Sequence, residues 1–394
     1  MRLINPLILL TPLALLHHVS AAAQLYSTWM ADSMIAHGVT ATRWYDVATF
    51  HRSIEMVYNA TSSPTYLKYL ISQIDAILHT NGSIKDWDLT DHQLDNIRVG
   101  AVILNLYTLN PLPKYKTALD FLHDQLVNKQ KRTPSGGYWH KDPKYPNQMW
   151  LDGLYMAEPF SAAYTSLFEA KNTSAWDNII LQFDLVEKHC RNQTTGMLYH
   201  GYDESLKAVW ADPKTGASPR VWDRAQGWYL MALVDVLDWF PTGHPGYAKL
   251  RGYLDTLAKA LKTAQDVKSG GWWLVMDAPY PGMEGNYIES SGTAMYTYGL
   301  LKGVRKGYLS GDVVEGYGKV AERAYGLMTE RFVARNGTNG TLNWEGTVRV
   351  GSLDGNGDFK YYTTVPIVEN SLLGLSPFVM ASVEMEAYIK AKGV

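Results

Sequence analysis

The sequence predicts an all-α protein whose helices form an (α/α)6 barrel, in which six inner helices are surrounded by six outer ones. Two observations lead to this fold. Apolar residues recur at every third or fourth position over most of the 394 residues, which is the period of amphipathic helices. Loops that combine glycine, aromatic and polar residues recur at intervals of roughly 60 to 75 residues, at 135–140, 196–203 and 269–277. Because each interval has the length of one or two helical hairpins, we expect these loops to gather at one end of a ring of hairpins.

The helical pattern accounts for about ten to twelve helices. The clearest segments are 66–78, 99–109, 115–127, 162–170, 177–188, 228–239, 246–265, 291–306, 313–331 and 371–390. Strand patterns are few and short, as at 347–350 and 360–363. A two-layer α-solenoid is the alternative fold, but solenoids usually lack aromatic glycine loops and have tighter repeat lengths.

The composition indicates one large domain. Hydrophobic residues make up 46% of the chain, and no Pro/Ser-rich linker or low-complexity tract divides residues 24–394. This content is ample for a buried core, so we expect a single domain there, as a monomer or a weak homo-oligomer. The net charge of −2 and the lack of a Lys/Arg cluster give no electrostatic footprint for nucleic acid or an anionic membrane surface.

The aromatic residues are mainly those with a polar edge, since 13 Trp and 26 Tyr outnumber nine Phe. Sugar-binding clefts use such side chains as stacking platforms. Large helical domains also use them to fill the space between helices, and most are expected to do so here.

The N-terminus predicts export. Arg2, the apolar run 6–16 and the small residues 20–23 have the order of a secretory signal peptide, with cleavage after Ala23. No later stretch has the roughly 18 apolar residues of a transmembrane helix, so we expect a secreted, soluble protein. Six N-glycosylation sequons agree with this expectation: Asn59, Asn81, Asn172, Asn192, Asn336 and Asn339.

Cys190 is the only cysteine, so no intramolecular disulfide can form. A buried helical thiol is the expected role of this residue, rather than a nucleophile. The core must therefore supply the stability of the protein.

Asp152 is the most informative residue of the chain. It lies in Trp-Leu-Asp-Gly-Leu-Tyr-Met at 150–156 and is the only charge between Lys144 and Glu158. A carboxyl group in apolar surroundings favours its neutral form, and a proton donor is a natural use of such an acid. Asp152 also suits the N-cap of the helix that follows it. The segment alone leaves both roles open.

Other polar residues stand in apolar or aromatic settings. Asp95 opens a helix and is either a site residue or a first-turn acid that complements the helix dipole. His140 and Lys141 follow two aromatic residues in a loop, and His200 lies in a loop between helices. These side chains are candidates for binding or catalysis.

Arg224 and Trp228 are four residues apart at the start of a helix and share one face. Arginine suits bidentate binding of a carboxylate, and tryptophan suits stacking on a sugar. A structural cation–π pair is the alternative. The sequence has no Gly-rich phosphate loop, His-Glu-X-X-His pattern or Cys-based metal site, and 354–358 lacks the flanks of an EF-hand. We expect no metal and no cofactor.

Four motifs together resemble a known family. They are Leu-Asp-Asn-Ile-Arg-Val-Gly at 94–100, the Asp152 motif continued to 157, Arg-Ala-Gln-Gly-Trp with the helix after it at 224–235, and Glu-Ser-Ser-Gly-Thr-Ala-Met at 289–295. In this order they resemble the unsaturated glucuronyl and rhamnogalacturonyl hydrolases of glycoside hydrolase family 105, which are relatives of family 88. The resemblance covers most of the chain after residue 23.

The resemblance implies an (α/α)6 barrel and an enzyme that removes a 4,5-unsaturated uronic acid from the non-reducing end of oligosaccharides left by polysaccharide lyases, with pectin-derived rhamnogalacturonan favoured. It implies that Asp152 is the proton donor. It places these residues around the unsaturated sugar: Asp95, His140, Lys141, His200, Arg224 and Trp228.

Two departures concern the substrate. Many family members carry Arg-Gly-Asn-Gly-Trp where this chain has Arg-Ala-Gln-Gly-Trp at 224–228, and the segment 346–355 differs from the glycine-rich loop of the rhamnogalacturonyl-specific members. Because this segment should bound the subsite of the leaving sugar, the identity of the substrate stays open. An unsaturated β-glucuronyl hydrolase acting on glucuronate-capped side chains is one alternative.

The expected chemistry follows from the substrate, which is a vinyl ether. Asp152 would protonate C4, positive charge would develop at C5 and the ring oxygen, and water would add at C5. The hemiketal then collapses, so the two-carboxylate spacing of ordinary glycosidases need not apply. Asp95 is a candidate for orienting the water or a sugar hydroxyl, and His200 for orienting the same water or binding the uronate carboxylate. Arg224 and His140 are candidates for charge recognition, and Trp228 for stacking.

Two other functions remain as alternatives. One is an inverting glycosidase or a sugar epimerase on the same barrel, which would use Asp152 with Asp95 or Glu289. The other is a carbohydrate-binding protein without catalysis.

Overall fold

The computed structural model describes residues 24–309 and 314–393. The predicted signal peptide at 1–23 lies outside these residues, as does the first residue of the helix predicted at 313–331. Helices dominate the described chain: α1 (Tyr26–His37), α2 (Tyr45–Thr61), α3 (Pro64–Ile77), α4 (Gly100–Leu109), α5 (Pro113–Asp124), α6 (Leu151–Phe168), α7 (Thr173–Cys190), α8 (Asp223–Val236), α9 (Pro245–Ala264), α10 (Ser290–Arg305), α11 (Val314–Arg331), α12 (Phe359–Thr364) and α13 (Leu372–Ala391).

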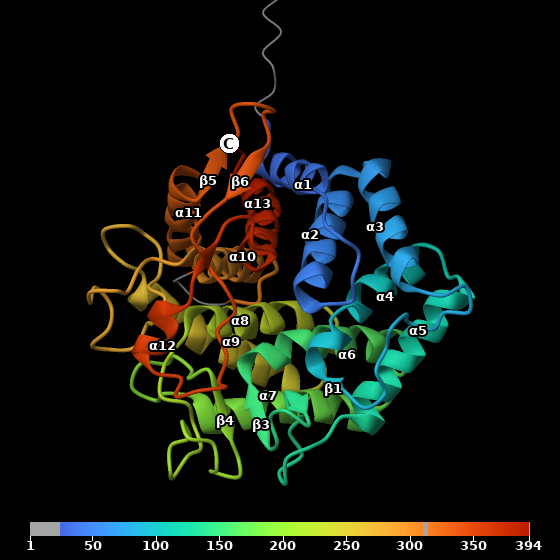
Figure 1. The fold of residues 1–394 in the computed structure, drawn as a ribbon, viewed down its shortest axis with the longest axis horizontal. Coiled ribbons are helices and arrows are strands. Elements are labelled where there is room, and N and C mark those ends of the chain that lie inside the picture. Colours follow the sequence, from blue (N-terminus) through green and yellow to red (C-terminus); the bar gives the residue numbers. More distant parts are fainter. Residues whose placement is uncertain (1–23, 310–313, 394) are drawn as a thin grey trace, which may run out of the picture.

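Six of these helices form a closed inner ring, in the order α2, α4, α6, α8, α10 and α13, and α13 packs against α2. Each inner helix has an outer partner: α3, α5, α7, α9 and α11 follow their inner helices in the chain, and α1 packs on α13. The first helix thus lies beside the last, which closes the ring (Figure 1). This architecture is the predicted (α/α)6 barrel.

The burial of α8 and α9 explains which helices are inner and which are outer. Every residue of α8 is buried, as expected for a helix that is enclosed on all sides. The outer helix α9 buries a stripe that includes Leu250, Leu254, Leu257 and Leu261, and its other faces are polar. One helix of the described residues, α13, has the length and mean hydropathy of a membrane span. Its apolar window is 72% buried within the barrel.

Short antiparallel strand pairs join the loops. They are β1 (His92–Gln93) with β2 (Lys141–Asp142), β3 (Gln148–Trp150) with β4 (Gly201–Asp203), β5 (Val333–Arg335) with β6 (Leu342–Trp344), and β7 (Thr347–Val348) with β8 (Ile367–Val368). A 3-10 helix, η1 (Leu94–Ile97), precedes α4, and a π-helical turn, η2 (Gln125–Lys129), follows α5.

Several predicted elements differ from the structure. The strand predicted at 360–363 is wrong, because the Asp358 side chain accepts the backbone N–H of Tyr361 at 2.8 Å and caps α12. The strand predicted at 347–350 is confirmed only at β7. Helices α1 and α2 were missed, and α6 begins eleven residues before the predicted start at 162. Gly153 and Pro159 lie inside α6 and disfavour a helix locally, and burial in the ring overrides them.

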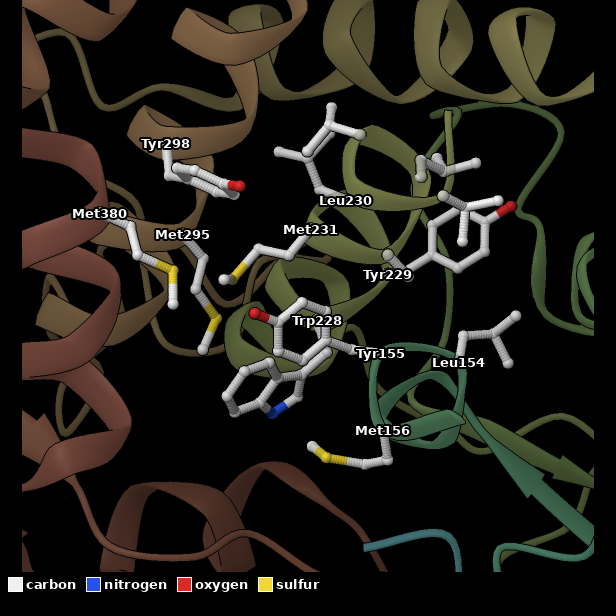
Figure 2. Close-up of a cluster of buried hydrophobic side chains, with 14 of the residues drawn as sticks. Leu154, Tyr155, Met156, Trp228, Tyr229, Leu230, Met231, Met295, Tyr298 and Met380 are labelled. Carbon is white, nitrogen blue, oxygen red and sulfur yellow. The ribbon is translucent and has the colours of Figure 1, made fainter. Parts of the chain in front are cut away.

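Aromatic and methionine side chains fill the middle of the barrel. Figure 2 shows Tyr155 of α6 facing Trp228 of α8, with Met231, Met295 and Met380 around them. The two rings are stacked, with centroids 5.0 Å apart and an interplanar angle of 22°. This layer supports the site at one end of the barrel.

Buried charges lie near the C-terminal ends of α8 and α10. The ammonium of Lys302 is 2.6 Å from an oxygen of Asp235 and 2.7 Å from one of Asp238, and its side chain is 3% exposed. The Tyr298 hydroxyl donates a further hydrogen bond to Asp235 at 2.6 Å. Burial raises the pKa of both carboxyl groups, but Lys302 together with the neighbouring cations and hydroxyl groups lowers it by more. The cluster is therefore ionised at neutral pH.

We expect Lys302→Met to lower the free energy of unfolding by about 3–5 kcal/mol, because two carboxylates would lose their buried partner. Equilibrium denaturation in guanidinium chloride measures this loss. The matched control is Lys306→Met. Lys306 also contacts Asp238, at 3.1 Å, but is 39% exposed, so we expect a loss below about 1 kcal/mol. Equal losses in the two variants would contradict this account of the cluster.

Candidate active site

A pocket of about 220 Å³ lies where the loops before several inner helices meet. Asp152 reaches it from the first turn of α6, Asp95 from η1, and His140 and Lys141 from the loop that enters β2. Four of the predicted site residues, from two separate motifs and a loop, are thus brought together. The remaining lining residues are Tyr45, Lys144, Tyr145, Trp150, Met156, Val350, Gly351, Ser352 and Asp354.

His200 stands directly beside Asp152, although it does not line the pocket. The pairing of β3 with β4 places the two residues, since the backbone N–H of Leu151 donates to the carbonyl of His200 at 2.9 Å. Nε2 of His200 is 3.1 Å from Oδ2 of Asp152. This distance suits an ion pair, but the two atoms are not aligned for a hydrogen bond. The imidazole is fully buried, and the Asp152 side chain is 14% exposed.

Tyr362 fixes the other side of the imidazole. Its hydroxyl lies 2.7 Å from Nδ1 of His200, and burial raises the pKa of Tyr362 well above its usual value, so the phenol keeps its proton. An imidazole that accepts this proton at Nδ1 carries its own hydrogen on Nε2, which faces Asp152. Trp222 packs on the imidazole at 4.9 Å. The imidazole is therefore held with Nε2 toward Asp152 and Nδ1 toward Tyr362.

The pKa of Asp152 is lowered, which corrects the expectation from the sequence. Burial raises it, as expected, but the imidazole of His200, His140 and a backbone hydrogen bond together lower it by more. Unliganded Asp152 is therefore a carboxylate at neutral pH. A role as proton donor requires that the substrate raise its pKa.

Asp95 is the second acid of the pocket. Its Oδ2 is 2.6 Å from the ammonium of Lys141, and its Oδ1 is 3.8 Å from Nε2 of His140. Burial lowers the pKa of Lys141, but the attraction and hydrogen bond of Asp95, with Tyr145, raise it by more, so Lys141 remains a cation. It is 24% exposed and lines the pocket. Lys141 is well placed to meet an anionic group.

His140 does not suit the predicted recognition of charge. Burial lowers its pKa to about 4, so the ring is neutral at neutral pH. It stacks on Trp150, with centroids 4.6 Å apart at 22°, and Trp150 in turn packs on Tyr145 at 4.4 Å. His140 can offer a hydrogen bond but no charge.

Arg224 and Trp228 do not line the pocket of the free protein, and their predicted contacts with the substrate stay predictions. Arg224 is 1% exposed and donates to Oγ of Ser291, to the carbonyls of Val348 and Arg349, and to Glu289. Trp228 is also 1% exposed and stacks on Tyr155. It supports Tyr45, which lines the pocket, in an edge contact at 6.4 Å. Either side chain would reach a sugar only if its neighbours moved.

Sequence reasoning missed three aromatic residues of the site. Tyr45 lies at the start of α2, a helix that the apolar pattern did not reveal, and burial raises its pKa, with Asp95 adding to the effect. The only indication of Tyr145 in the sequence was its position directly after the charged Lys144, which is a weak sign of a site residue. Tyr362 had none, because it lies 162 residues from His200 in the sequence.

A second cavity of about 360 Å³ lies on the other side of the Tyr155–Trp228 layer. Its lining includes Arg52, Glu55, Asp235 and Asp238, and these groups are paired with each other or with Lys302. Among residues 24–309 and 314–393, no three His, Cys, Asp or Glu side chains form a group that could hold a metal ion. The small pocket at Asp152 is the better candidate for chemistry.

The chain is similar to glycoside hydrolases. It matches the family described as Glycosyl Hydrolase Family 88 over residues 22–389. A solved glycoside hydrolase of family 105 from C. acetobutylicum ATCC 824 is 37% identical, with a TM-score of 0.86 over 92% of this chain and 100% of that one. The unsaturated 3S-rhamnoglycuronyl hydrolase of Alteromonas sp. (strain LOR) is 26% identical over 174 residues, which are 42% of this chain and 38% of that protein.

A further solved structure shares the fold at low identity. The unsaturated glucuronyl hydrolase of Bacillus sp. GL1, which is described as responsible for the degradation of glycosaminoglycan, is 11% identical. It superposes with a TM-score of 0.68 over 92% of this chain and 96% of that one.

We expect His200→Gln to raise the pKa of Asp152, because the group that lowers it is lost while its burial remains. Carbon-13 NMR of protein labelled at aspartate carboxyl groups would follow the titration, with Asp152→Asn to assign the signal. Tyr362→Phe is the matched control, since it keeps the imidazole and should shift the titration less. An unchanged or lower pKa in His200→Gln would show that His200 does not set the charge of Asp152.

Proposed function

This chain belongs to glycosyl hydrolase family 88 and is a relative of the family 105 enzymes, and we propose that it removes a 4,5-unsaturated uronic acid from the non-reducing end of oligosaccharides that polysaccharide lyases release. One observation carries the proposal: the acid Asp152 shares a pocket of about 220 Å³ with the cation Lys141. A pocket of this size favours one terminal sugar over a continuous chain. The neighbouring helix N-termini also favour an anionic ligand.

In the proposed reaction, Asp152 donates its proton to C4 of the unsaturated ring, and the electron pair of the C4–C5 double bond forms the new C–H bond. The ring oxygen stabilises the positive charge that develops at C5. Water then adds at C5 and returns a proton to Asp152, and the resulting hemiketal opens to release the leaving sugar. Asp95 orients a sugar hydroxyl or the water. Lys141 compensates the uronate charge.

The uronate itself supplies the shift that Asp152 needs. In the free protein His200 holds the pKa of Asp152 below its usual value. A carboxylate that enters the same buried pocket is a like charge and raises that pKa. Substrate binding would thus convert a resting carboxylate into an acid that carries a proton.

Rhamnogalacturonan fragments are the favoured substrate. The motifs at 94–100, 150–157 and 289–295, which resemble those of the rhamnogalacturonyl hydrolases, support this choice. A screen of lyase products from rhamnogalacturonan, homogalacturonan and glycosaminoglycan would test it, because hydration removes the ultraviolet absorbance of the conjugated double bond. The highest kcat/KM on a non-pectic product would overturn the choice.

We also propose that the protein is secreted and glycosylated. Four of the sequon asparagines are exposed on the surface, namely Asn59, Asn81, Asn172 and Asn339, and Asn192 and Asn336 are partly exposed. Mass spectrometry of protein secreted from a eukaryotic host, with and without removal of N-glycans, tests both parts. Retention of the protein in the cells would contradict secretion, and an unchanged mass would contradict glycosylation.

We expect Asp152→Asn to lower kcat by about a hundred- to ten-thousand-fold with little change in substrate binding, because the variant has no proton to donate. The measurement is the loss of ultraviolet absorbance on an unsaturated disaccharide, with binding followed by calorimetry. Asp177→Asn is the control, since Asp177 is 70% exposed on the outer helix α7. Wild-type turnover by Asp152→Asn would refute the assignment.

The pH profile should separate free from bound protein. The profile of kcat/KM reports the free enzyme and that of kcat the complex. Because a proton donor must be protonated, both should fall as the pH rises through the pKa of Asp152. This pKa is low in the free protein and raised by the uronate, so kcat should persist to higher pH than kcat/KM. Coincident profiles would show that the substrate does not shift Asp152.

A further inference from the structure

One wall of the pocket is a backbone segment rather than a helix. Residues 350–352 line the pocket together with Asp152, and only Arg349 separates them from β7. Gly351 lies flat on the indole of Trp222, where a Cβ atom would come within 2.8 Å of the ring. The segment is thus pressed onto the same Trp222 that packs on His200.

A buried ion pair holds this wall from behind. Arg224 donates to the carbonyl oxygens of Val348 and Arg349. Glu289 accepts the backbone N–H of Val348 at 3.0 Å. The two side chains are 3.4 Å apart and at most 2% exposed. Three backbone polar groups of two consecutive residues therefore depend on one Arg–Glu pair.

The N-terminus of α10 anchors the pair. Glu289 accepts the backbone N–H of Gly292 at 2.8 Å and the hydroxyl of Ser291 at 2.7 Å. Arg224 donates to the same hydroxyl at 2.7 Å. The wall is therefore attached to the starts of α8 and α10, which are both inner helices. Its position is a property of the barrel and not of a loose loop.

Asp223 completes the cluster as a neutral acid. It is fully buried, and its carboxyl lies against Gly292, where a Cβ atom would come within 2.3 Å of Oδ2. Neither of its oxygens receives a hydrogen bond from a donor among the described residues. Burial, and then Glu289, raise the pKa of Asp223, and Arg224 only partly opposes them. The carboxyl group of Asp223 therefore favours its neutral form beside Glu289.

We propose that Arg224 and Glu289 are positioning residues that fix the wall at 348–352 and thereby shape the subsite of the leaving sugar. This inference rests on the proposed function for its substrate. Arg224 affects the substrate through the wall, because the N–H groups of its guanidinium donate to other groups of the protein. At the uronate end of the substrate, Lys141 compensates the charge and Asp152 donates the proton.

Hydrogen–deuterium exchange tests whether Arg224 and Glu289 hold the wall, and it does not depend on enzyme activity. We expect Glu289→Gln to speed exchange of peptides covering 346–353 by roughly tenfold, because a charged acceptor is lost from the Val348 N–H, while peptides of α6 exchange as in wild type. Asp223→Asn should match wild type, since asparagine resembles the neutral acid. Unchanged exchange at 346–353 in Glu289→Gln would show that Arg224 and Glu289 do not hold the wall.

Kinetics with two leaving groups test its role in the subsite. Glu289→Gln and Gly351→Ala, which pushes the wall off Trp222, should lower kcat/KM roughly tenfold, mainly through KM, on an unsaturated uronyl disaccharide. They should change it little on the methyl glycoside of the same uronic acid. Equal losses on both substrates would overturn the inference by placing Glu289 at the uronate. Wild-type values on both would also overturn it.

The two experiments separate the inference from the proposed function. If wild type consumes neither substrate, the proposed function fails, while the exchange data still decide whether Arg224 and Glu289 hold the wall.

Discussion

The pairing of β3 with β4 is the constraint on which the site depends. It joins the loop before α6 to the loop after α7, and its last hydrogen bond places His200 beside Asp152. Without it, Asp152 would be an acid at a helix start with only its burial to set its pKa. With it, the same acid faces an imidazole whose opposite nitrogen is fixed by Tyr362. A short strand pair in a helical protein thus determines the protonation of the central residue.

The sequence revealed the barrel and the acid because both leave local signals. The helical period identified most helices, and the aromatic surroundings singled out Asp152. The residues that modify Asp152 leave no such signal. Tyr362 is distant in the chain, and Tyr45 starts a helix whose buried face includes His51, Ser53 and Glu55, so its apolar period is interrupted.

The sequence indicates only part of the surroundings of Arg224 and Trp228. Spacing showed correctly that the two side chains share a helix face, but it could not show what covers that face. Val348 and Arg349 occupy the donors of Arg224, and Tyr155 occupies one face of Trp228. Both partners come from other parts of the chain. Residue type indicates what a side chain can bind, whereas the tertiary fold decides what it does bind.

Comparison of the buried charges at different points of the barrel indicates why chemistry belongs at Asp152. Asp235 is held by an ammonium and a phenol that keep their protons at neutral pH, so its charge is fixed and serves stability. Asp223 is fixed in the opposite state, because burial and Glu289 keep it neutral. Asp152 is balanced between burial and an imidazole, and it alone of these three lines the pocket at this end of the barrel. A ligand that carries one negative charge can shift this balance, which is the property that a proton donor requires.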